Sequence, residues 1–327
     1  MLLEFLIPVY GESPYLEKTL KSIYTDFDNK SGVLIVLDRP TEAQQARIEQ
    51  FTRFYSNLRV ILSQGAGIAF ALNAGINYSR AKYIRRIDSD DELLPDGLEK
   101  QVQFLMDNPD FACVGGQMNF INENGSVIGE TCYPLNYFEI LKRLEYQNCI
   151  AHPATLLNRQ HVLNIGGYRS AMSGAEDYDL WLRLTNCYKL ANLNFKVTNY
   201  RISDQQYSKS LGSRQLLVEN LARANWKFSK LNLGFREIPA EFKNEKEIEG
   251  TIRSLEEAIK KSSKASFYRL QSSKKINIAM KISQNDSNLF YKRISQLILL
   301  IQASIMSPAM VKNFTLGFNK FRNIRYE

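Results

Sequence analysis

The chain has 327 residues, of which 44% are hydrophobic, and a formal net charge of +8. No stretch approaches the roughly 20 apolar residues that cross a bilayer, and Glu4 within the first apolar run favours a strand over a signal peptide. Four widely spaced cysteines and two histidines argue against a zinc site or a disulfide framework, and they favour a cytosolic protein with reduced thiols.

The positive charge is concentrated near the carboxyl terminus. Residues 251–327 contain 14 Lys and Arg against 4 Asp and Glu, whereas the rest of the chain is close to neutral. Such an asymmetry favours a polyanionic partner, either a nucleic acid or an anionic membrane surface.

Strands and helices alternate over the first 117 residues. Apolar patterns predict strands at 2–9, 33–37, 58–62, 83–87 and 111–116, and helices at 14–24, after Thr41, at 67–78 and from Pro95. This alternation predicts an α/β fold with a mostly parallel sheet and helices on both faces. Ligands of such sheets bind beyond the carboxyl ends of the strands, where Asp38, Asp88, Asp90 and Asp91 are expected.

The pattern changes after residue 117. The segment NENGS at 122–126 is typical of a hairpin turn, and GGYR at 166–169 indicates another turn. The amphipathic segment AEDYDLWLRL at 175–184 predicts a helix that begins with acidic residues. Helices are also expected at 211–231, at about 245–260 and at 289–306.

The aspartates of DSDD, residues 88–91, have two interpretations. Carboxylate oxygens are hard ligands that suit Mg²⁺ or Mn²⁺, and a bound cation offsets the repulsion between neighbouring carboxylates. The alternative is a solvated acidic turn that caps the following helix, and the motif alone favours that alternative.

The other motifs are equally ambiguous when each is taken alone. Glu176 and Asp177 could simply match a helix dipole, or one of them could be a general base. The segment GAGIAFALNAG at 65–75 is neither a P-loop nor GxGxxG, although its glycines allow close backbone approach to a ligand. His152 could be a core histidine, and Arg201 could be a surface charge or a phosphate ligand.

Together, the order of these motifs resembles family 2 glycosyltransferases. The motifs are PVYGE, Asp38, GAGIAFALNAG, RRIDSDDELLP, AHPATLLNR, GGYR, AEDYDLWLRL and YRISDQQYS. The chain is most similar to bacterial enzymes of exopolysaccharide, capsule and O-antigen synthesis, including amylovoran-type galactosyltransferases. The resemblance covers about residues 3 to 210 and implies a GT-A fold, a nucleotide-diphosphate sugar donor, a divalent metal and inversion at the anomeric carbon.

The resemblance also assigns roles to residues. Asp177 is the implied general base, with Glu176 as its acidic neighbour, and Asp90 and Asp91 hold Mn²⁺ or Mg²⁺. His152 and Arg201 belong to the acceptor or diphosphate side. The residues implied at the donor nucleotide are Pro8, Val9, Tyr10, Glu12, Asp38, Gly67, Asn73, Arg86 and Asp88, with Asp38 facing the base. Ser203 departs from the family pattern, because relatives often have a histidine there that can contact the metal or the diphosphate.

These features predict two regions and one function. Residues 1–210 would form the GT-A domain and 211–327 a basic helical region. The expected enzyme is a hexosyltransferase that uses a UDP-sugar, with a preference for UDP-galactose, and a polyprenyl-diphosphate-linked or oligosaccharide acceptor. An apolar segment flanked by Lys292, Arg293 and Lys312 favours peripheral attachment to the inner face of the cytoplasmic membrane. The alternative for this segment is a helical packing module with solvated lysines.

Two other function classes compete with this prediction. A sugar-phosphate nucleotidyltransferase would need a glycine-rich, basic loop after the first strand, and PVYGESPYLEK lacks it. A nucleic-acid-binding protein would use the basic tail, but few aromatic residues are interleaved with its charges. We therefore expect no nucleic-acid partner.

Overall fold

The computed structural model describes residues 1–25, 31–202, 212–233 and 236–272. The chain divides into two compact units, Met1–Arg253 and Ser254–Glu327. Within the described ranges, no helix is both long and apolar enough to span a membrane. The predicted helix at 289–306, the basic segment at 292–312 and Ser203 all lie outside the described residues.

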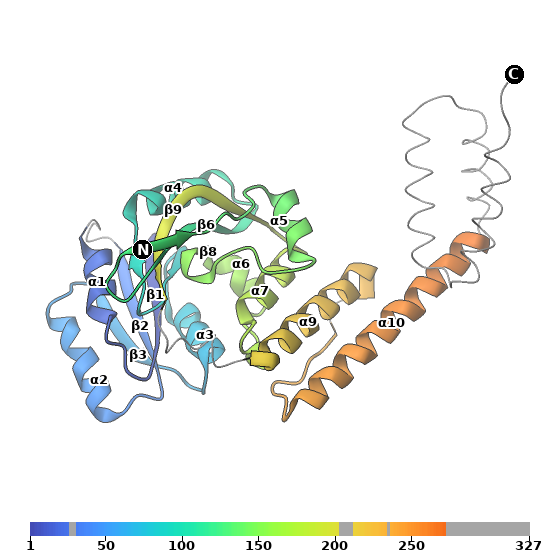
Figure 1. The fold of residues 1–327 in the computed structure, drawn as a ribbon, viewed down its shortest axis with the longest axis horizontal. Coiled ribbons are helices and arrows are strands. Elements are labelled where there is room, and N and C mark those ends of the chain that lie inside the picture. Colours follow the sequence, from blue (N-terminus) through green and yellow to red (C-terminus); the bar gives the residue numbers. More distant parts are fainter. Residues whose placement is uncertain (26–30, 203–211, 234–235, 273–327) are drawn as a thin grey trace, which may run out of the picture. The chain divides into compact units, whose positions relative to one another are not determined.

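A mixed sheet forms the centre of the first unit (Figure 1). Its strands, in spatial order, are β3 (Leu58–Leu62), β2 (Gly32–Asp38), β1 (Leu3–Tyr10), β4 (Tyr83–Arg86), β8 (Leu156–Asn158), β6 (Phe111–Ile121), β9 (Lys189–Arg201) and β5 (Glu92–Leu93), with β7 (Val127–Glu130) beside β6. The pairs among β1, β2, β3 and β4 and the pair of β6 with β9 are parallel. Strand β8 runs antiparallel between β4 and β6.

Helices cover both faces of this sheet. The helices between β1 and β9 in the chain are α1 (Leu16–Tyr24), α2 (Glu42–Glu49), α3 (Ile68–Tyr78), α4 (Pro95–Asp107), α5 (Tyr137–Leu144), α6 (Arg159–Asn164) and α7 (Glu176–Leu184), and two more helices, α9 (Gly212–Phe228) and α10 (Glu245–Ser272), follow β9. Short helical turns are η1 (Gln50–Arg53), η2 (His152–Ala154), η3 (Ser170–Met172) and η4 (Ser229–Leu233). Figure 1 shows α1 and α2 on one side of β1–β3 and α3 on the other.

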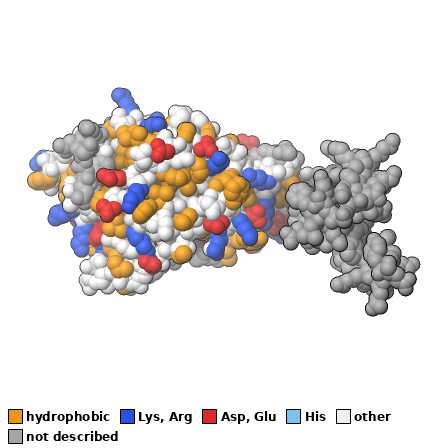
Figure 2. Space-filling model, turned by 90° about the horizontal axis from the view of Figure 1, so that it is seen from above, with side chains coloured by type: hydrophobic (Ala, Val, Ile, Leu, Met, Phe, Trp, Pro, Cys, Tyr) orange, Lys and Arg blue, Asp and Glu red, His pale blue; other side chains and the backbone are white. Residues whose placement is uncertain are grey.

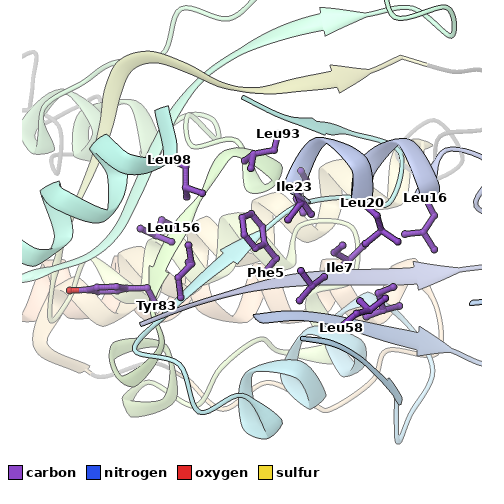
Figure 3. Packing of buried hydrophobic residues seen from close by; sticks show 14 of the residues in the cluster. Phe5, Ile7, Leu16, Leu20, Ile23, Leu58, Tyr83, Leu93, Leu98 and Leu156 are labelled. Atoms are coloured by element: carbon purple, nitrogen blue, oxygen red, sulfur yellow. The ribbon is translucent and has the colours of Figure 1, made fainter. Parts of the chain in front are cut away.

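The core explains why these segments fold as they do. Successive side chains of a strand point to opposite faces, so the odd-numbered residues of β1 lie on one side. Phe5 and Ile7 pack there against Leu20 and Ile23 of α1, and all four are at most 1% exposed (Figure 3). On the other face, Leu6 lies so close to α3 that a Cβ on Gly75 would be 2.1 Å from its Cδ1.

Most predicted elements are confirmed. The turn at 122–126 joins β6 to β7, with Asn122 N donating to Ser126 O at 3.0 Å. Helix α10 continues to Ser272, beyond the predicted end at residue 260. Helix α9 packs against α7, and Trp226 Nε1 donates to Thr185 Oγ1 at 3.0 Å. The domain boundary at residue 210 stays a prediction.

The sequence analysis missed β8, β9, α5 and α6. Strand β9 has an irregular burial pattern because its pairing with β6 shifts register several times. Helix α5 carried a recognisable signal, since the side chain of Asn136 accepts from Glu139 N at 3.1 Å and caps the helix. Figure 2 shows charged side chains of both signs among apolar ones on the face that it presents, in keeping with the nearly neutral charge of residues 1–250.

Candidate active site

The acidic turn after β4, residues 88–91, brings three carboxylates together. One oxygen from each of Asp88, Asp90 and Asp91 lies within 4.8 Å of the others. Asp91 is fully buried, and the other two are partly buried. Arg86 at the end of β4 is also buried, and its Nη1 donates to Asp88 Oδ2 at 2.8 Å. Because the strand fixes the start of this turn, the carboxylates are held close to one another.

Burial and mutual repulsion make ionisation of this turn costly. Burial, reinforced by the charge of Asp88, raises the pKa of Asp90 to about 6. Burial and the neighbouring carboxylates raise the pKa of Asp91 well above its usual value. Among the described residues, the buried Oδ2 of Asp91 has no hydrogen-bond partner. Hard oxygen ligands, one of them unpaired, fit a divalent cation such as Mg²⁺ or Mn²⁺.

Arg201, at the end of β9, supports this turn from behind. Its backbone N–H donates to Asp91 Oδ1 and its Nε donates to Asp90 O, both at 2.9 Å. Its Nη1 donates to Asn122 O at 2.9 Å, and its side chain is fully buried. The guanidinium of Arg201 thus donates hydrogen bonds to the protein itself. This geometry favours a role in positioning the acidic turn over the predicted contact with the acceptor or the diphosphate.

The ends of β1 and β2 meet at the same edge of the sheet. Tyr10 pairs with Asp38 in the parallel register, and Asp38 Oδ2 accepts from Gly67 N at 2.8 Å. Gly67 has a φ of +102°, a conformation that favours glycine. Two of the predicted nucleotide residues, Asp38 and Gly67, are therefore in direct contact.

The other predicted residues of the first strand differ in exposure. Pro8 and Val9 are buried within β1, so their side chains support the strand. Tyr10 is 64% exposed, with the Arg39 guanidinium 5.2 Å from its ring centroid. Glu12 is exposed, and its Oε2 lies 3.2 Å from Arg47 Nη1. Among the described residues, the Glu12 side chain thus pairs with α2 through Arg47 and not with the acidic turn.

Asn73 connects α3 to the turn that carries GGYR. Its Nδ2 donates to Tyr168 O and its Oδ1 accepts from Tyr168 N, each at 2.8 Å. Gly167 lies directly beneath this amide, since a Cβ there would be 2.5 Å from Asn73 Oδ1. Both polar ends of Asn73, a predicted nucleotide-binding residue, thus contact the backbone of Tyr168. The side chain therefore holds the GGYR turn against α3.

His152 is buried beside two aromatic rings. Its Nε2 lies 2.8 Å from the Tyr168 hydroxyl, and Trp181 meets the imidazole edge-on with ring centroids 5.8 Å apart. Burial, followed by the charge of Arg86, holds the pKa of His152 well below its usual value. The imidazole is therefore neutral, and it lies near Arg86.

The first turn of α7 carries the predicted base. Asp177 Oδ2 accepts from Asn148 Nδ2 at 2.8 Å, and Oδ1 accepts from Tyr178 N at 2.6 Å. Burial raises the pKa of Asp177, although these donors and Arg86 oppose that shift. Glu176 Oε2 accepts from Gly174 N at 2.8 Å. Burial, with the charge of Asp177, raises the pKa of Glu176 to about 7.

Arg86 links the acidic turn to α7 electrostatically. Its positive charge opposes the rise in pKa that burial causes at Asp90 and Asp91 of the turn and at Glu176 and Asp177 of α7. The predicted metal and base residues are therefore all within reach of the charge of one buried guanidinium. This arrangement suits a reaction in which a base acts on one substrate while negative charge grows on another.

An ion-pair network that the sequence analysis missed fixes α7. Asp179 is 1% exposed and pairs with Arg169 of GGYR and with Arg183, whose Nε lies 2.8 Å from Asp179 Oδ2. Arg183 Nη2 also donates to Gly167 O at 2.6 Å. The i,i+4 spacing of Asp179 and Arg183 was visible in the sequence. Asn148 and Tyr168, also missed, carried no such signal.

A separate hollow of about 580 Å³ lies at the opposite, amino-terminal edge of the sheet. Arg59, Arg80 and Arg159 contribute to its lining, and none of the predicted site residues does. The candidate site therefore consists of the acidic turn with Arg86, together with the first turn of α7, whose carboxylates feel the charge of Arg86.

The comparisons with known proteins identify the family. Residues 4–166 match the family model described as Glycosyl transferase family 2. The chain is 32% identical over 218 residues to the O-antigen biosynthesis glycosyltransferase WbnJ of Escherichia coli. The aligned region covers 64% of this chain and 83% of WbnJ. The chain belongs to glycosyl transferase family 2. This glycosyltransferase is also 27% identical to the amylovoran biosynthesis glycosyltransferase AmsE of Erwinia amylovora, over 63% of this chain and 79% of AmsE.

Solved structures support the fold of this family 2 glycosyltransferase. TarS of S. aureus (residues 1–349), in complex with UDP-GlcNAc, aligns with a TM-score of 0.55 and 15% identity over 89% of this chain and 78% of the TarS chain. The predicted GT-A fold and family are thereby confirmed, and the protein is a glycosyltransferase.

Proposed function

We propose that this glycosyltransferase transfers a hexose from a UDP-sugar to a lipid-linked or oligosaccharide acceptor, with inversion, in the synthesis of a bacterial surface polysaccharide. The observation that carries the proposal is that the clustered aspartates of the acidic turn and the Glu176–Asp177 pair all feel the charge of the buried Arg86. The names of WbnJ and AmsE support the polysaccharide, and the UDP-GlcNAc complex of TarS supports a UDP-sugar. UDP-galactose is the preferred donor, ahead of UDP-glucose and UDP-N-acetylhexosamines.

Asp177 acts on the acceptor in this proposal. The acceptor hydroxyl attacks the anomeric carbon from the face opposite the leaving group, and Asp177 takes its proton as the new bond forms. Burial raises the pKa of Asp177, which increases its basicity, while Asn148 and Tyr178 N–H hold the carboxylate in place. A single displacement of this kind needs one base and forms no covalent bond with the enzyme.

The donor is bound at the sheet edge. Asp38 accepts a hydrogen bond from the nucleobase, Asp88 lies near the ribose, and Arg86 faces the diphosphate with its positive charge. When bound, a divalent cation at Asp90 and Asp91 offsets the charge that develops on the departing diphosphate. The unpaired Oδ2 of Asp91 supports that assignment.

The basic tail would attach the enzyme to the membrane that holds lipid-linked acceptors. Each Lys or Arg near an anionic surface contributes about 1 kcal/mol. Changing Lys292, Arg293 and Lys312 to Glu in the full chain should reduce sedimentation with anionic vesicles and leave thermal stability unchanged. Equal sedimentation of variant and wild type would remove this part of the proposal.

A ligand screen tests the donor assignment. A ligand at 100 times its dissociation constant stabilises the native state by about 2.7 kcal/mol, which corresponds to a rise in melting temperature of roughly 5–10 °C for a unit of this size. UDP-sugars should produce this rise with Mn²⁺ present and a smaller one without it. Asp177→Asn should retain the rise and lose transfer. A protein indifferent to every uridine nucleotide would refute the proposal.

A further inference from the structure

We propose that Asn148 is the positioning residue of Asp177, holding its carboxylate in the orientation that receives the acceptor proton. The inference rests on the proposed role of Asp177 as the general base. Asn148 lies in the segment between α5 and η2, about 30 residues before α7 in sequence, and its Nδ2 donates to Asp177 Oδ2 at 2.8 Å.

The orientation of the Asn148 amide is fixed by a second contact. Ile150 N donates to Asn148 Oδ1 at 3.2 Å, so the oxygen end of the amide already has a partner. The NH₂ end must then point toward Asp177, because a flipped amide would place an oxygen against the carboxylate and an NH₂ group against a backbone N–H. Two independent partners thus agree on the same orientation.

The carboxylate of Asp177 has little rotational freedom as a result. Asn148 donates to Oδ2, and Tyr178 N donates to Oδ1 at 2.6 Å. A carboxylate oxygen can accept two hydrogen bonds, so each oxygen of Asp177 retains one lone pair for the hydroxyl group of the acceptor sugar. Rotation about the terminal bond would break both hydrogen bonds, which keeps those free positions in one direction.

The segment that carries Asn148 is itself anchored to the sheet. The carbonyl of the buried residue Cys149 accepts from Asn192 Nδ2 of β9 at 3.0 Å. Four residues after Asn148, His152 contacts the Tyr168 hydroxyl. The same short segment thereby places Asn148 beside the base and His152 near Arg86, and its anchoring at Cys149, directly after Asn148, limits movement of Asn148.

The charged groups around Asp177 show why an uncharged hydrogen-bond donor such as Asn148 is suited to this position. Arg86 of β4 stabilises the ionised carboxylate, whereas Glu219 of α9 and the adjacent Glu176 oppose it. Tyr133 and Tyr168 also face this charge, since Asp177 raises the pKa of each tyrosine in addition to the larger effect of burial. Asn148 adds a hydrogen bond that favours the ionised form without adding a charge that would attract the donor diphosphate.

Substitution of Asn148 should move the pH dependence of transfer. Asn148→Ala removes a hydrogen bond to the ionised base, so the acid limb of kcat should move upward by about one pH unit. Activity at pH values well below the wild-type midpoint should then fall about tenfold and recover toward pH 9, with the KM for the donor unchanged. Asn148→Asp preserves the shape of the side chain and the contact with Ile150 N but places a second negative charge beside Asp177. The acid limb of its kcat profile should therefore move to a still higher pH.

The experiment measures kcat and KM from pH 5 to 9 at constant Mn²⁺ for the full chain and these two variants. Asn108→Ala is the matched control, since Asn108 is also partly buried and donates one hydrogen bond, to Phe104 O at 2.9 Å, at the end of α4. Its profile should overlay that of the wild type. If a variant loses the same factor at every pH, or overlays the wild type, Asn148 does not position the base.

These outcomes separate the inference from the proposed function. Inactivity of Asp177→Asn together with a wild-type profile for both Asn148 variants would refute only the role of Asn148. Absence of transfer by the wild type with every UDP-sugar would refute the proposed function and this inference with it. The isosteric Asn148→Asp variant keeps the test decisive if Asn148→Ala fails to fold.

Discussion

The buried network around Asp179 allows a quantitative prediction of stability. Asp179→Asn replaces a carboxylate that is 1% exposed and contacts two arginines with a neutral amide of the same size. Breaking a buried ion pair costs about 3–5 kcal/mol, because the remaining charges stay buried without compensation. For a unit of the size of residues 1–253, each kcal/mol lowers the melting temperature by about 2–4 °C, so we expect a fall of roughly 6–20 °C.

Differential scanning calorimetry of wild type and variant at pH 7 measures this fall. The matched control is Asp110→Asn, which breaks a pair with Lys189 at 2.7 Å whose side chains are 54% and 51% exposed. An exposed pair contributes little to stability, so the control should show only a small fraction of the fall expected for Asp179→Asn. Equal losses in the two variants would refute the claim that the network around Asp179 carries stability through its burial.

The pH dependence gives a second check on the same network. Burial opposes ionisation of Asp179, but Arg183 and Arg169 outweigh it and lower its pKa below the usual value. A carboxylate whose folded pKa is depressed contributes stability above its unfolded pKa and loses it as the pH falls through the folded pKa. The difference between wild type and Asp179→Asn should therefore be largest near neutral pH and shrink in acid.

Three further substitutions address the site. Asp90→Ala should weaken UDP binding in the presence of Mn²⁺ by at least about tenfold and leave metal-free binding nearly unchanged, measured by titration calorimetry; equal weakening in both conditions would contradict the metal assignment. Glu176→Gln should gain on the order of 2 kcal/mol relative to wild type between pH 5 and 8, because the raised pKa of about 7 means that folding favours the protonated form and wild-type stability is lost as the pH rises; a constant difference in melting temperature would count against it. Gly167→Ala should destabilise the fold by about 1–3 kcal/mol in urea unfolding, since φ is +67° and the new Cβ would be 2.5 Å from Asn73 Oδ1; Gly250→Ala, with no atom within 4 Å of the added Cβ, is the control and should be neutral or better.

The first half of the fold followed directly from local pattern. Buried strands such as Val33–Leu37 and helices with one apolar face, such as that of Leu16, Leu20 and Ile23, need only short-range periodicity to be recognised. The insertion of β8 between β4 and β6 could not be predicted in this way, because pairing between Ile84 and Leu157 depends on residues 73 positions apart. Strand order is a property of tertiary packing, which single-sequence patterns do not contain.

The positions of several candidate site residues followed from the sequence, whereas their roles stay predictions. The aspartates of the acidic turn and the Glu176–Asp177 pair are grouped as predicted, and Asp38 contacts Gly67. The amide partners were not predictable in the same way. Asn73 and Asn148 meet their partners only after distant segments come together, at Tyr168 and Asp177. The fixed position of Arg201 beneath Asp90 and Asp91 likewise depends on where β9 ends in the folded protein.

The buried guanidinium of Arg86 makes the two halves of the enzyme electrically interdependent. The charge of Arg86 acts on the carboxylates of the acidic turn and of α7 alike, so a charge that arrives or leaves at the sheet edge alters the potential at the first turn of α7. In the proposed mechanism, departure of the anionic leaving nucleotide would thus lower the proton affinity of Asp177 just when it must discharge the proton that it has received. Resetting the enzyme for another turnover and emptying its nucleotide site would then be a single electrostatic event.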